Sequence, residues 1–485
     1  MKSPAARTRE ALLLGGLLVV GAAARLHAIG ERSYWFDEGA TLGMVRLPFV
    51  EFLRHAWDPG LNNQVFYYLA LRPWHVLGES ETALRAFSAA FSVATIAVGY
   101  ALGRRLFGAA AGAIAGAILA LHPWLVRYAQ EARAYSLAVF LVSLSALFLA
   151  RHLESRARRD LVGWVVAGGF ALYAHFFAGL AIAAQITSLA VLGIRELRER
   201  KGLLVGALVL AALELPIAVF LIVVPKGLVE WVPPVSLSTL DHVGSFLTGG
   251  TVLLPPVFLA AIAGTAILGA RARAARDRWA AALVVGWALL PTLAMAAVSL
   301  AQPILIGRYV LMSAPAFALA LAAALGRLAE RRRIGAAAAS IVVALVALVY
   351  VLVLRTEIYV EAYEDWRLVA EEVAEATLPG DAVVYDSPWG GVTLEYYLER
   401  AARRPDPLQP GPLLFDGEFD VGQAERRERL WLVLSREDGA RTVALLSRLR
   451  RTHPVISARA YAGGLIKVVL LDRARRAPGA GAFGY

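Results

Sequence analysis

Two adjacent carboxylates, Asp37 and Glu38 in the motif Trp35-Phe36-Asp37-Glu38, follow the first apolar segment of the chain. Carboxylates near a bilayer cost free energy unless they are solvated, paired or used in chemistry. As a general base, a carboxylate can take the proton from an attacking hydroxyl, which contributes about 10²–10⁴-fold in rate. In the structural alternative, one of the pair caps a helix that starts near Gly39. We favour a catalytic role for Asp37, whereas Glu38 could be a catalytic partner, a metal ligand, an orienting group or a cap.

A second polar stretch runs from Tyr128 to Tyr135 and carries Gln130, Glu131 and Arg133. Arg133 comes just before an apolar segment, where its planar fork of donors could clamp a phosphate. In the alternative, Arg133 extends along the interface and pairs with Glu131. We favour the phosphate contact, and we regard Tyr128, Gln130 and Glu131 as candidates for substrate binding or support.

Four further residues are candidates. Arg308 and Tyr309 begin another apolar segment, and a cation there would stabilise a departing lipid phosphate. His175 lies between two short apolar segments, so it is either a hydrogen-bonded structural histidine or a site residue. Asn63, in the polar run 62–64, is a candidate for substrate contact or support.

A divalent metal is an additional hypothesis, because Asp37, Glu38 and Glu131 could gather round one ion, although they have no familiar ligand spacing. The chain has no cysteine, which excludes disulfides, thiol nucleophiles and Cys-type zinc sites. P-loop, dinucleotide-binding, GxSxG and HExxH motifs are also absent from the sequence. The net charge of +11 comes from short clusters between apolar runs, which is typical of membrane orientation signals and not of nucleic-acid binding.

The elements that must position these residues are membrane helices, since 58% of the residues are hydrophobic and only 18% are charged. Helices that cross hydrocarbon need about 20 residues. About eleven spans are predicted, at 11–29, 83–103, 109–121, 134–150, 161–174, 177–194, 203–224, 251–270, 279–299, 305–326 and 334–354. Arg/Lys clusters at residues 2–9, 104–105, 151–159, 195–201, 271–278 and 327–333 indicate the cytoplasmic side, together with the N-terminus.

With this orientation, the candidate residues lie in loops on the extracytoplasmic side. The first external loop covers residues 29–82, and its apolar segment 65–77 is predicted to lie as a helix at the outer interface. The transmembrane domain therefore covers residues 1–354. From about residue 355 the apolar runs shorten, which predicts a small extracytoplasmic α/β domain over 355–485. Its expected elements are helices at 365–377 and 394–399 and strands at 382–385, 430–434 and 465–471.

Four motifs in this order resemble the GT-C superfamily of glycosyltransferases. They are the acidic pair Asp37-Glu38 and the segments 62–68, 84–88 and 130–135. The resemblance covers roughly residues 10–355 and is nearest to the bacterial relatives of protein O-mannosyltransferases and of the lipid A aminoarabinose transferase. It implies the GT-C type of polytopic fold and an inverting transferase that uses polyprenyl-phosphate sugars at its external face.

By this resemblance, Asp37 matches the catalytic base of the family motif, and Arg133 matches the arginine linked to donor-phosphate binding. Two departures are visible. The common Pro-Pro-Leu-Tyr-Tyr pattern is replaced here by the sequence at 63–68, and residues 355–485 do not resemble the β-trefoil domain of eukaryotic mannosyltransferases. Protein O-mannosylation is therefore not carried over.

The resulting hypothesis is a glycosyltransferase of the bacterial cytoplasmic (inner) membrane. Its expected partners are membrane lipids and a polyprenyl-phosphate sugar donor, with a protein, glycan or lipid acceptor. The alternative is a non-enzymatic flippase or transporter of lipid-linked sugars. That alternative predicts polar residues at the bilayer midplane and repeated halves. The sequence places mostly Ala, Leu and Val there, with Glu214 as the main exception.

Overall fold

The computed structural model describes residues 4–56, 64–223, 232–331, 333–360, 364–408, 421–435 and 440–474. The chain divides into two compact units. The helical unit consists of Met1–Ile29, Leu53–Gly78 and Thr82–Val360. The C-terminal unit consists of Gly30–Phe52, Glu79–Glu81 and Glu361–Tyr485. Both ends of the first external loop thus cluster with the C-terminal part of the chain.

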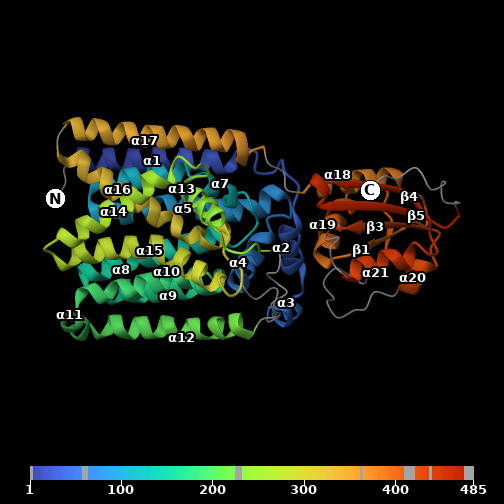
Figure 1. The fold of residues 1–485 in the computed structure, drawn as a ribbon, viewed down its shortest axis with the longest axis horizontal. Helices are drawn as coiled ribbons and strands as arrows, with labels where there is room; N and C mark the ends of the chain where they lie inside the picture. The colour runs from blue at the N-terminus through green and yellow to red at the C-terminus, as the bar shows by residue number, and fades with distance from the viewer. Residues whose placement is uncertain are drawn as a thin grey trace. The chain divides into compact units, whose positions relative to one another are not determined.

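The helical unit is a bundle whose long helices run side by side (Figure 1). Within it, α9 (Arg158–Ala174) lies between α8 (Tyr135–Ser155) and α12 (Lys201–Val223). The described helices are α1 (Pro4–Leu26), α4 (Val65–His75), α5 (Glu81–Phe107), α6 (Ala109–Leu121), α7 (Pro123–Ala129), α8 (Tyr135–Ser155), α9 (Arg158–Ala174), α10 (Ala178–Ser188), α11 (Ile194–Glu199), α12 (Lys201–Val223), α13 (Leu237–Thr248), α14 (Pro255–Arg271), α15 (Ala275–Ser299), α16 (Ala314–Arg331) and α17 (Arg333–Val353). A 3₁₀ turn, Gly307–Ser313, precedes α16, and a π turn, Leu354–Ile358, follows α17. The predicted interfacial segment is indeed helical, as α4.

Helix occupies most of each of the eleven predicted spans. Among the described residues, five helical stretches are long and apolar enough to cross a membrane: Glu81–Phe107, Tyr135–Ser155, Ala275–Ser299, Gly307–Glu330 and Arg333–Ile358. The number rises to six if α6 and α7, which meet at an angle of 55°, form one broken span. The sequence placed a loop where α7 lies. Pro123 starts α7 because a proline at the first helical position loses no intrahelical hydrogen bond. The count of eleven spans remains a prediction.

Arg25, at the end of α1, shows how polar groups are satisfied inside the helical unit. Its side chain is fully buried, and its guanidinium donates to Ser92 Oγ at 2.8 Å. The same group donates to the carbonyls of Leu119 at 2.9 Å and Ala120 at 2.7 Å, near the end of α6. Because the last carbonyls of a helix lack intrahelical partners, Arg25 stabilises the point where α6 bends into α7.

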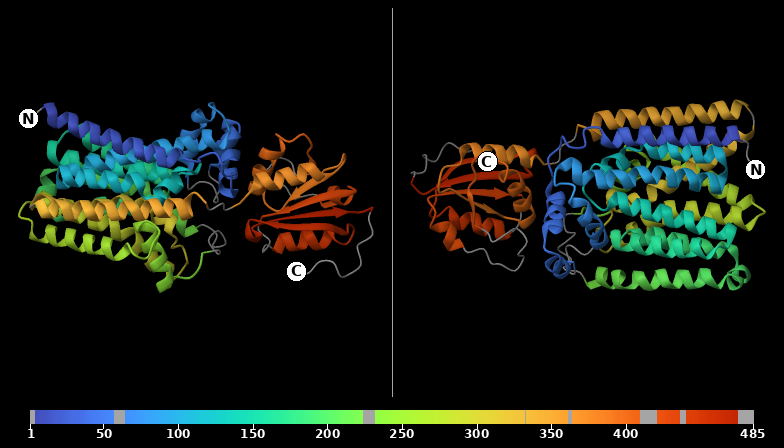
Figure 2. Two further views of the ribbon diagram at one scale, coloured as in Figure 1. Left: turned by 90° about the horizontal axis from the view of Figure 1, so that it is seen from above. Right: turned by 180° about the vertical axis from the view of Figure 1, so that it is seen from behind.

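The C-terminal unit contains a mixed sheet with helices on both of its faces (Figure 2). Its helices are α2 (Phe36–Arg46), α18 (Trp366–Ala376), α19 (Pro388–Leu398), α20 (Val421–Glu425) and α21 (Ala440–Leu449), and α3 (Phe49–His55) begins in this unit. Its strands are β1 (Ala382–Tyr385), β2 (Asp406–Pro407), β3 (Arg429–Leu434), β4 (Val455–Tyr461) and β5 (Ile466–Asp472). The strand order is β2-β1-β3-β5-β4. β1 is parallel to β2 and β3, whereas β5 is antiparallel to β3 and β4.

The three predicted strands and both predicted helices of this unit are present. The central strands of the sheet are apolar throughout, because both faces of the sheet are covered by helices. One face packs on α20 and α21 through Ala382, Val384, Leu430, Leu432, Leu434, Val469, Leu471, Ala424 and Leu449. The sequence did not predict strand β4. Its residues 458–460 are exposed and include Arg459, so β4 lacks the apolar run that marks the other strands.

Helix α2 also belongs to the C-terminal unit, where it packs against α19. It ends at Arg46, just before Leu47-Pro48, because a proline disfavours the helical conformation of the residue that precedes it. The acidic motif of the first external loop is therefore held within the same compact unit as the C-terminal sheet.

Candidate functional site

Asp37 and Glu38 lie in the first turn of α2, which starts at Phe36 and not near Gly39. Negative side chains in the first turn of a helix interact favourably with its exposed N–H groups and with its dipole. The two carboxylates differ in exposure: Glu38 is fully buried, whereas Asp37 is half-buried. The pair thus consists of one carboxylate enclosed by protein and one that keeps solvent access.

Glu38 makes a contact of the kind expected for a helix cap, one of the roles that the sequence left open. It is the third residue of α2, and its Oε2 accepts a hydrogen bond from the backbone N–H of Trp35, the N-cap, at 3.4 Å. This is the side-chain half of a capping box, in which the third helical residue reaches back to the N-cap. Asp37 is the member of the pair with an exposed part that could receive a proton.

The second polar stretch forms the connection between α7 and α8 in the helical unit. Glu131 makes a buried ion pair with Arg127, with 3.3 Å between Oε1 and Nε. Gln130 donates from its amide to the carbonyls of Arg25 at 3.1 Å and His27 at 2.6 Å, which ties this connection to the end of α1. These contacts hold the α7–α8 connection in place, and a role of Gln130 in substrate binding stays a prediction.

Arg133 is held in place through its backbone. Its N–H donates to the carbonyl of Glu131 at 2.8 Å, and its carbonyl accepts from Ser88 Oγ at 3.2 Å. Ser88 lies in α5, and its hydroxyl is 3.2 Å from the hydroxyl of Tyr67 in α4. The side chain of Arg133 is nearly buried, with 7% of the residue exposed. Ser88 of α5, which is itself in contact with Tyr67 of α4, therefore holds the backbone of this arginine.

Aromatic side chains connect the α7–α8 connection to the other two candidate positions. The ring of Tyr135 lies 4.7 Å from Tyr128 and 5.1 Å from His175, between ring centroids. His175 in turn lies 6.1 Å from Tyr309, whose ring faces the guanidinium of Arg308 at 5.6 Å. The helical unit thus brings together residues from the ends of α8, α9 and the turn before α16.

His175 has an unusual electrostatic setting. It is 1% exposed, and neither ring nitrogen has a hydrogen-bond partner among the described residues. Burial, and after it the positive charges of Arg133 and Arg308, lower the pKa of His175 from its ordinary value of 6.5 to about 3. The imidazole is therefore neutral at physiological pH, and two guanidinium groups lie close enough to act on it. Such a cluster favours an anion as ligand.

The remaining predictions concern a metal and Asn63. Among the described parts of the chain, no group of three or more His, Asp or Glu side chains could hold a metal ion. The hypothesis of a site built from Asp37, Glu38 and Glu131 thus finds no support in this geometry, and Glu131 is engaged by Arg127 instead. Asn63 lies outside the residues that the structure describes.

Sequence reasoning missed the buried partner of Glu131 and the support of Arg133. The spacing of Arg127 and Glu131, four residues apart in sequence, was a usable signal, because such residues are neighbours on one helical face. Ser88 lies in a motif that carried the family resemblance, but nothing in its local sequence indicated a contact with Arg133. That contact depends on how α5 packs.

The chain is similar to known proteins in part of its sequence and in its fold. The model of a family described as dolichyl-phosphate-mannose-protein mannosyltransferase matches residues 65–220. The crystal structure of ArnT from Cupriavidus metallidurans in the apo state is 17% identical, with a TM-score of 0.62 over 97% of this chain and 98% of that one. ArnT bound to undecaprenyl phosphate gives 16% identity and a TM-score of 0.58, over 96% and 98% of the two chains.

A third similar structure is archaeal. The oligosaccharyltransferase AglB from Archaeoglobus fulgidus, in complex with an inhibitory peptide and a dolichol-phosphate, is 14% identical. Its TM-score is 0.56 over 96% of this chain and 74% of that one. No curated protein matches the chain by sequence. At these levels of identity, the structural likenesses establish a shared fold.

Proposed function

We propose that the chain is an inverting membrane glycosyltransferase of the GT-C type that uses a polyprenyl-phosphate sugar. The family model that matches residues 65–220 and the fold shared with ArnT and AglB support this class. The acceptor is a hydroxyl group, and transfer takes place on the extracytoplasmic side of a bacterial cytoplasmic membrane. The Arg/Lys clusters between the apolar segments support this orientation. The ligands of two similar structures, undecaprenyl phosphate and a dolichol-phosphate, support the class of donor.

The observation that carries the proposal is the pair Arg133 and Arg308 beside the neutral, buried His175. Two guanidinium groups that act on one buried imidazole make the potential around it positive, and a phosphate is an anion that such a potential attracts. Arginine suits this role because its planar fork can donate two hydrogen bonds to phosphate oxygens. Arg133 would hold the donor phosphate, and Arg308 would stabilise the charge that develops on it as the sugar leaves.

Asp37 is the proposed base. It would take the proton of the acceptor hydroxyl while the acceptor oxygen forms a bond to the anomeric carbon. The bond between that carbon and the phosphate oxygen breaks, and polyprenyl phosphate departs with the electron pair. Attack on the face opposite the leaving group inverts the anomeric configuration. A carboxylate suits this step because the transition state carries positive, oxocarbenium-like charge. Glu38 would keep α2 in shape by its hydrogen bond to Trp35.

The test is transfer from a panel of synthetic polyprenyl-phosphate sugars that includes mannose, arabinose, glucose and galactose. Purified wild type, Asp37→Asn and Glu51→Gln would be compared with and without a chelator. Glu51 is a matched control because it is an exposed carboxylate of the same loop, in α3. We expect wild type and Glu51→Gln to release polyprenyl phosphate and Asp37→Asn to lose at least about 10²-fold in rate.

Two outcomes would contradict the proposal. Full activity of Asp37→Asn would show that another group is the base. Absence of release from every donor, together with movement of the donor between leaflets of vesicles, would favour the flippase alternative. The anomeric configuration of the product, read by NMR, tests the inversion separately.

A further inference from the structure

The N-terminal end of α2 is held by a residue far away in the sequence. The backbone N–H of Phe36, the first residue of α2, donates to Glu364 Oε2 at 2.8 Å. The same carboxylate oxygen accepts from Trp366 Nε1 at 2.5 Å, which fixes it at the start of α18. A helix leaves its first N–H groups without intrahelical partners, and a carboxylate is a strong acceptor for them. Glu364 therefore caps the helix that carries Asp37.

The residues that lead into α2 are held by the same part of the unit. Ser33 Oγ donates to the carbonyl of Glu364 at 2.8 Å and accepts from the backbone N–H of Trp366 at 3.1 Å. The backbone N–H of Tyr34 donates to the hydroxyl of Tyr397 in α19 at 2.7 Å. The backbone just before the acidic motif thus has contacts with both α18 and α19.

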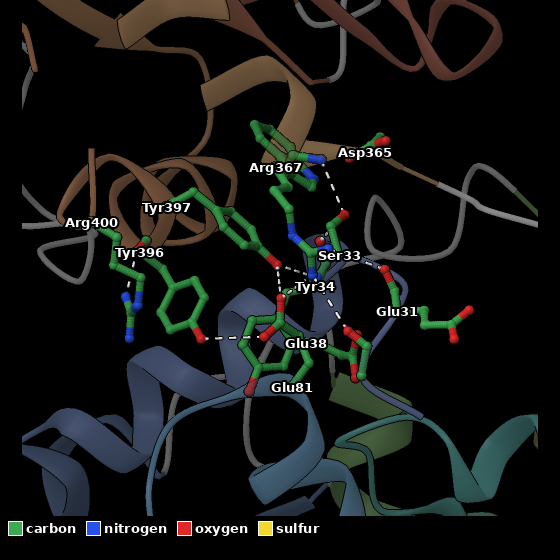
Figure 3. Close-up of polar contacts among 12 residues, drawn as sticks. Glu31, Ser33, Tyr34, Glu38, Glu81, Asp365, Arg367, Tyr396, Tyr397 and Arg400 are labelled. Atoms are coloured by element: carbon green, nitrogen blue, oxygen red, sulfur yellow. Dashed lines mark hydrogen bonds and ion pairs between the residues drawn. The ribbon is translucent and has the colours of Figure 1, made fainter. Parts of the chain in front are cut away.

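Tyr397 is itself held by a charged pair (Figure 3). Its hydroxyl donates to Glu81 Oε1 at 2.7 Å, and Arg367 in α18 also donates to that oxygen at 2.7 Å. Tyr396, its neighbour in α19, packs edge-on against the ring of Tyr34 at 5.1 Å between centroids. The hydroxyl of Tyr397 therefore donates its proton to Glu81 and uses a lone pair to accept the N–H of Tyr34.

The other end of α2 is fastened too. Arg46, its last residue, pairs with Glu79 at 2.7 Å and with Glu399, which follows α19, at 3.1 Å. Its guanidinium also lies over the ring of Tyr396 at 5.8 Å. Helix α2 is therefore held at its N-terminal end by Glu364 and at its C-terminal end by Glu79 and Glu399, and it packs against α19. All of these groups belong to the C-terminal unit.

We propose that Glu364 and Tyr397 are positioning residues that set the place of Asp37 by holding the N-terminal end of α2. The C-terminal domain thereby has a role in catalysis, even though Glu364 and Tyr397 do not touch the reacting atoms. This inference rests on the proposed function insofar as Asp37 is the base. A catalytic group must be placed to within about 1 Å, so a loosened α2 would reduce turnover while donor binding is retained.

The test combines hydrogen exchange with kinetics in the full-length protein. Glu364→Ala should raise the exchange rate of the first α2 amides about tenfold to a hundredfold, which corresponds to the loss of a hydrogen bond to a charged acceptor. It should lower kcat by a similar factor and leave the KM for the polyprenyl-phosphate sugar unchanged. Glu364→Gln should restore most of both properties, because an amide oxygen can still accept from Phe36 and Trp366.

Two further variants complete the design. Tyr397→Phe keeps the ring and removes only the hydroxyl, and it should loosen the amide of Tyr34 and lower kcat. Glu372→Ala is the matched control: this carboxylate in α18 accepts from Arg459 at 2.7 Å and from Tyr461 at 2.6 Å, both in β4. It should leave exchange in α2 and kcat as in wild type.

The two proposals fail in different ways. Unchanged exchange in α2 for Glu364→Ala and Tyr397→Phe would overturn the positioning role, whatever the activity. Faster exchange with an unchanged kcat would also overturn it, because α2 would then be held for stability alone. If wild type releases no polyprenyl phosphate from any donor, the proposed function fails, while the exchange data still decide whether Glu364 and Tyr397 hold α2.

Discussion

Removing either of the two guanidinium groups beside His175 should weaken binding of the donor phosphate. A hydrogen bond to a charged group contributes about 1.5–3 kcal/mol, and about 1.4 kcal/mol corresponds to a tenfold change in Kd. Arg133→Gln and Arg308→Gln are therefore each expected to raise the Kd for undecaprenyl phosphate about tenfold to a hundredfold. Glutamine keeps a polar side chain in the buried site, so the loss reports mainly on charge.

The double variant sharpens this prediction. Two arginines that contact the same phosphate share its charge, so their effects on binding free energy should be non-additive by about 0.5–3 kcal/mol. Binding would be measured by titration of the purified protein in detergent with undecaprenyl phosphate. Arg159→Gln serves as the control, because Arg159 is an exposed arginine in the first turn of α9, in a predicted cytoplasmic cluster. The Kd of Arg159→Gln for undecaprenyl phosphate should equal that of wild type.

The reasoning would be refuted by a specific pattern. If Arg133→Gln and Arg308→Gln fold normally and bind undecaprenyl phosphate as wild type does, the cluster around His175 is not the phosphate site. If the two effects are large and strictly additive, the arginines bind independent groups. A loss that is equally large for Arg159→Gln would indicate a general effect of net charge.

Three other predictions concern the same region. Glu131→Gln removes the carboxylate that pairs with the buried Arg127. Breaking such a pair should destabilise the protein by about 3–5 kcal/mol, which would be seen as a lower Tm in thermal unfolding. An unchanged Tm would refute the buried pairing. Gly307→Ala would place a Cβ 2.6 Å from the ring of Phe246, so the turn that carries Arg308 must shift. The Kd for undecaprenyl phosphate should therefore rise without a large loss of Tm. The pKa of His175 is about 3 when folded and 6.5 ordinarily, so the unfolded chain binds the extra proton and stability falls as pH drops through this window. Because pH 4.5 lies two pH units below 6.5, the free energy of unfolding should be about 3 kcal/mol lower at pH 4.5 than at neutral pH. Between pH 7.5 and pH 4.5, the His175→Asn variant should therefore lose less stability than wild type.

Much of the architecture follows from local patterns of residues. Apolar runs are sufficient to predict helix at all eleven predicted spans, because a segment in hydrocarbon must satisfy its backbone hydrogen bonds internally. The strands at 382–385 and 430–434 were predictable for a related reason, since both faces of the sheet are covered and the strands are apolar throughout. The exposed strand β4 lacks that signal and was missed.

The residue types of the candidate site were also visible in the sequence. Asp37 and Arg133 stand out because charged groups next to apolar segments cost free energy and need a reason to be there. Sequence alone left the role of Glu38 open between catalysis, a metal and a cap. The structure adds a capping contact, the hydrogen bond from the N–H of Trp35 to Glu38, which requires the helix to start at Phe36.

Sequence by itself therefore determined the membrane class, the helical segments, the α/β character of the C-terminal region and the carboxylate and arginines on which the proposed chemistry depends. Tertiary structure alone decided which groups meet: Arg133 and Arg308 near His175, and Glu364 on the N–H of Phe36 across 328 residues of chain. The physical reason is that periodicity and helix signals act over a few residues. A hydrogen bond between distant segments depends on the packing of whole helices, which local sequence does not encode.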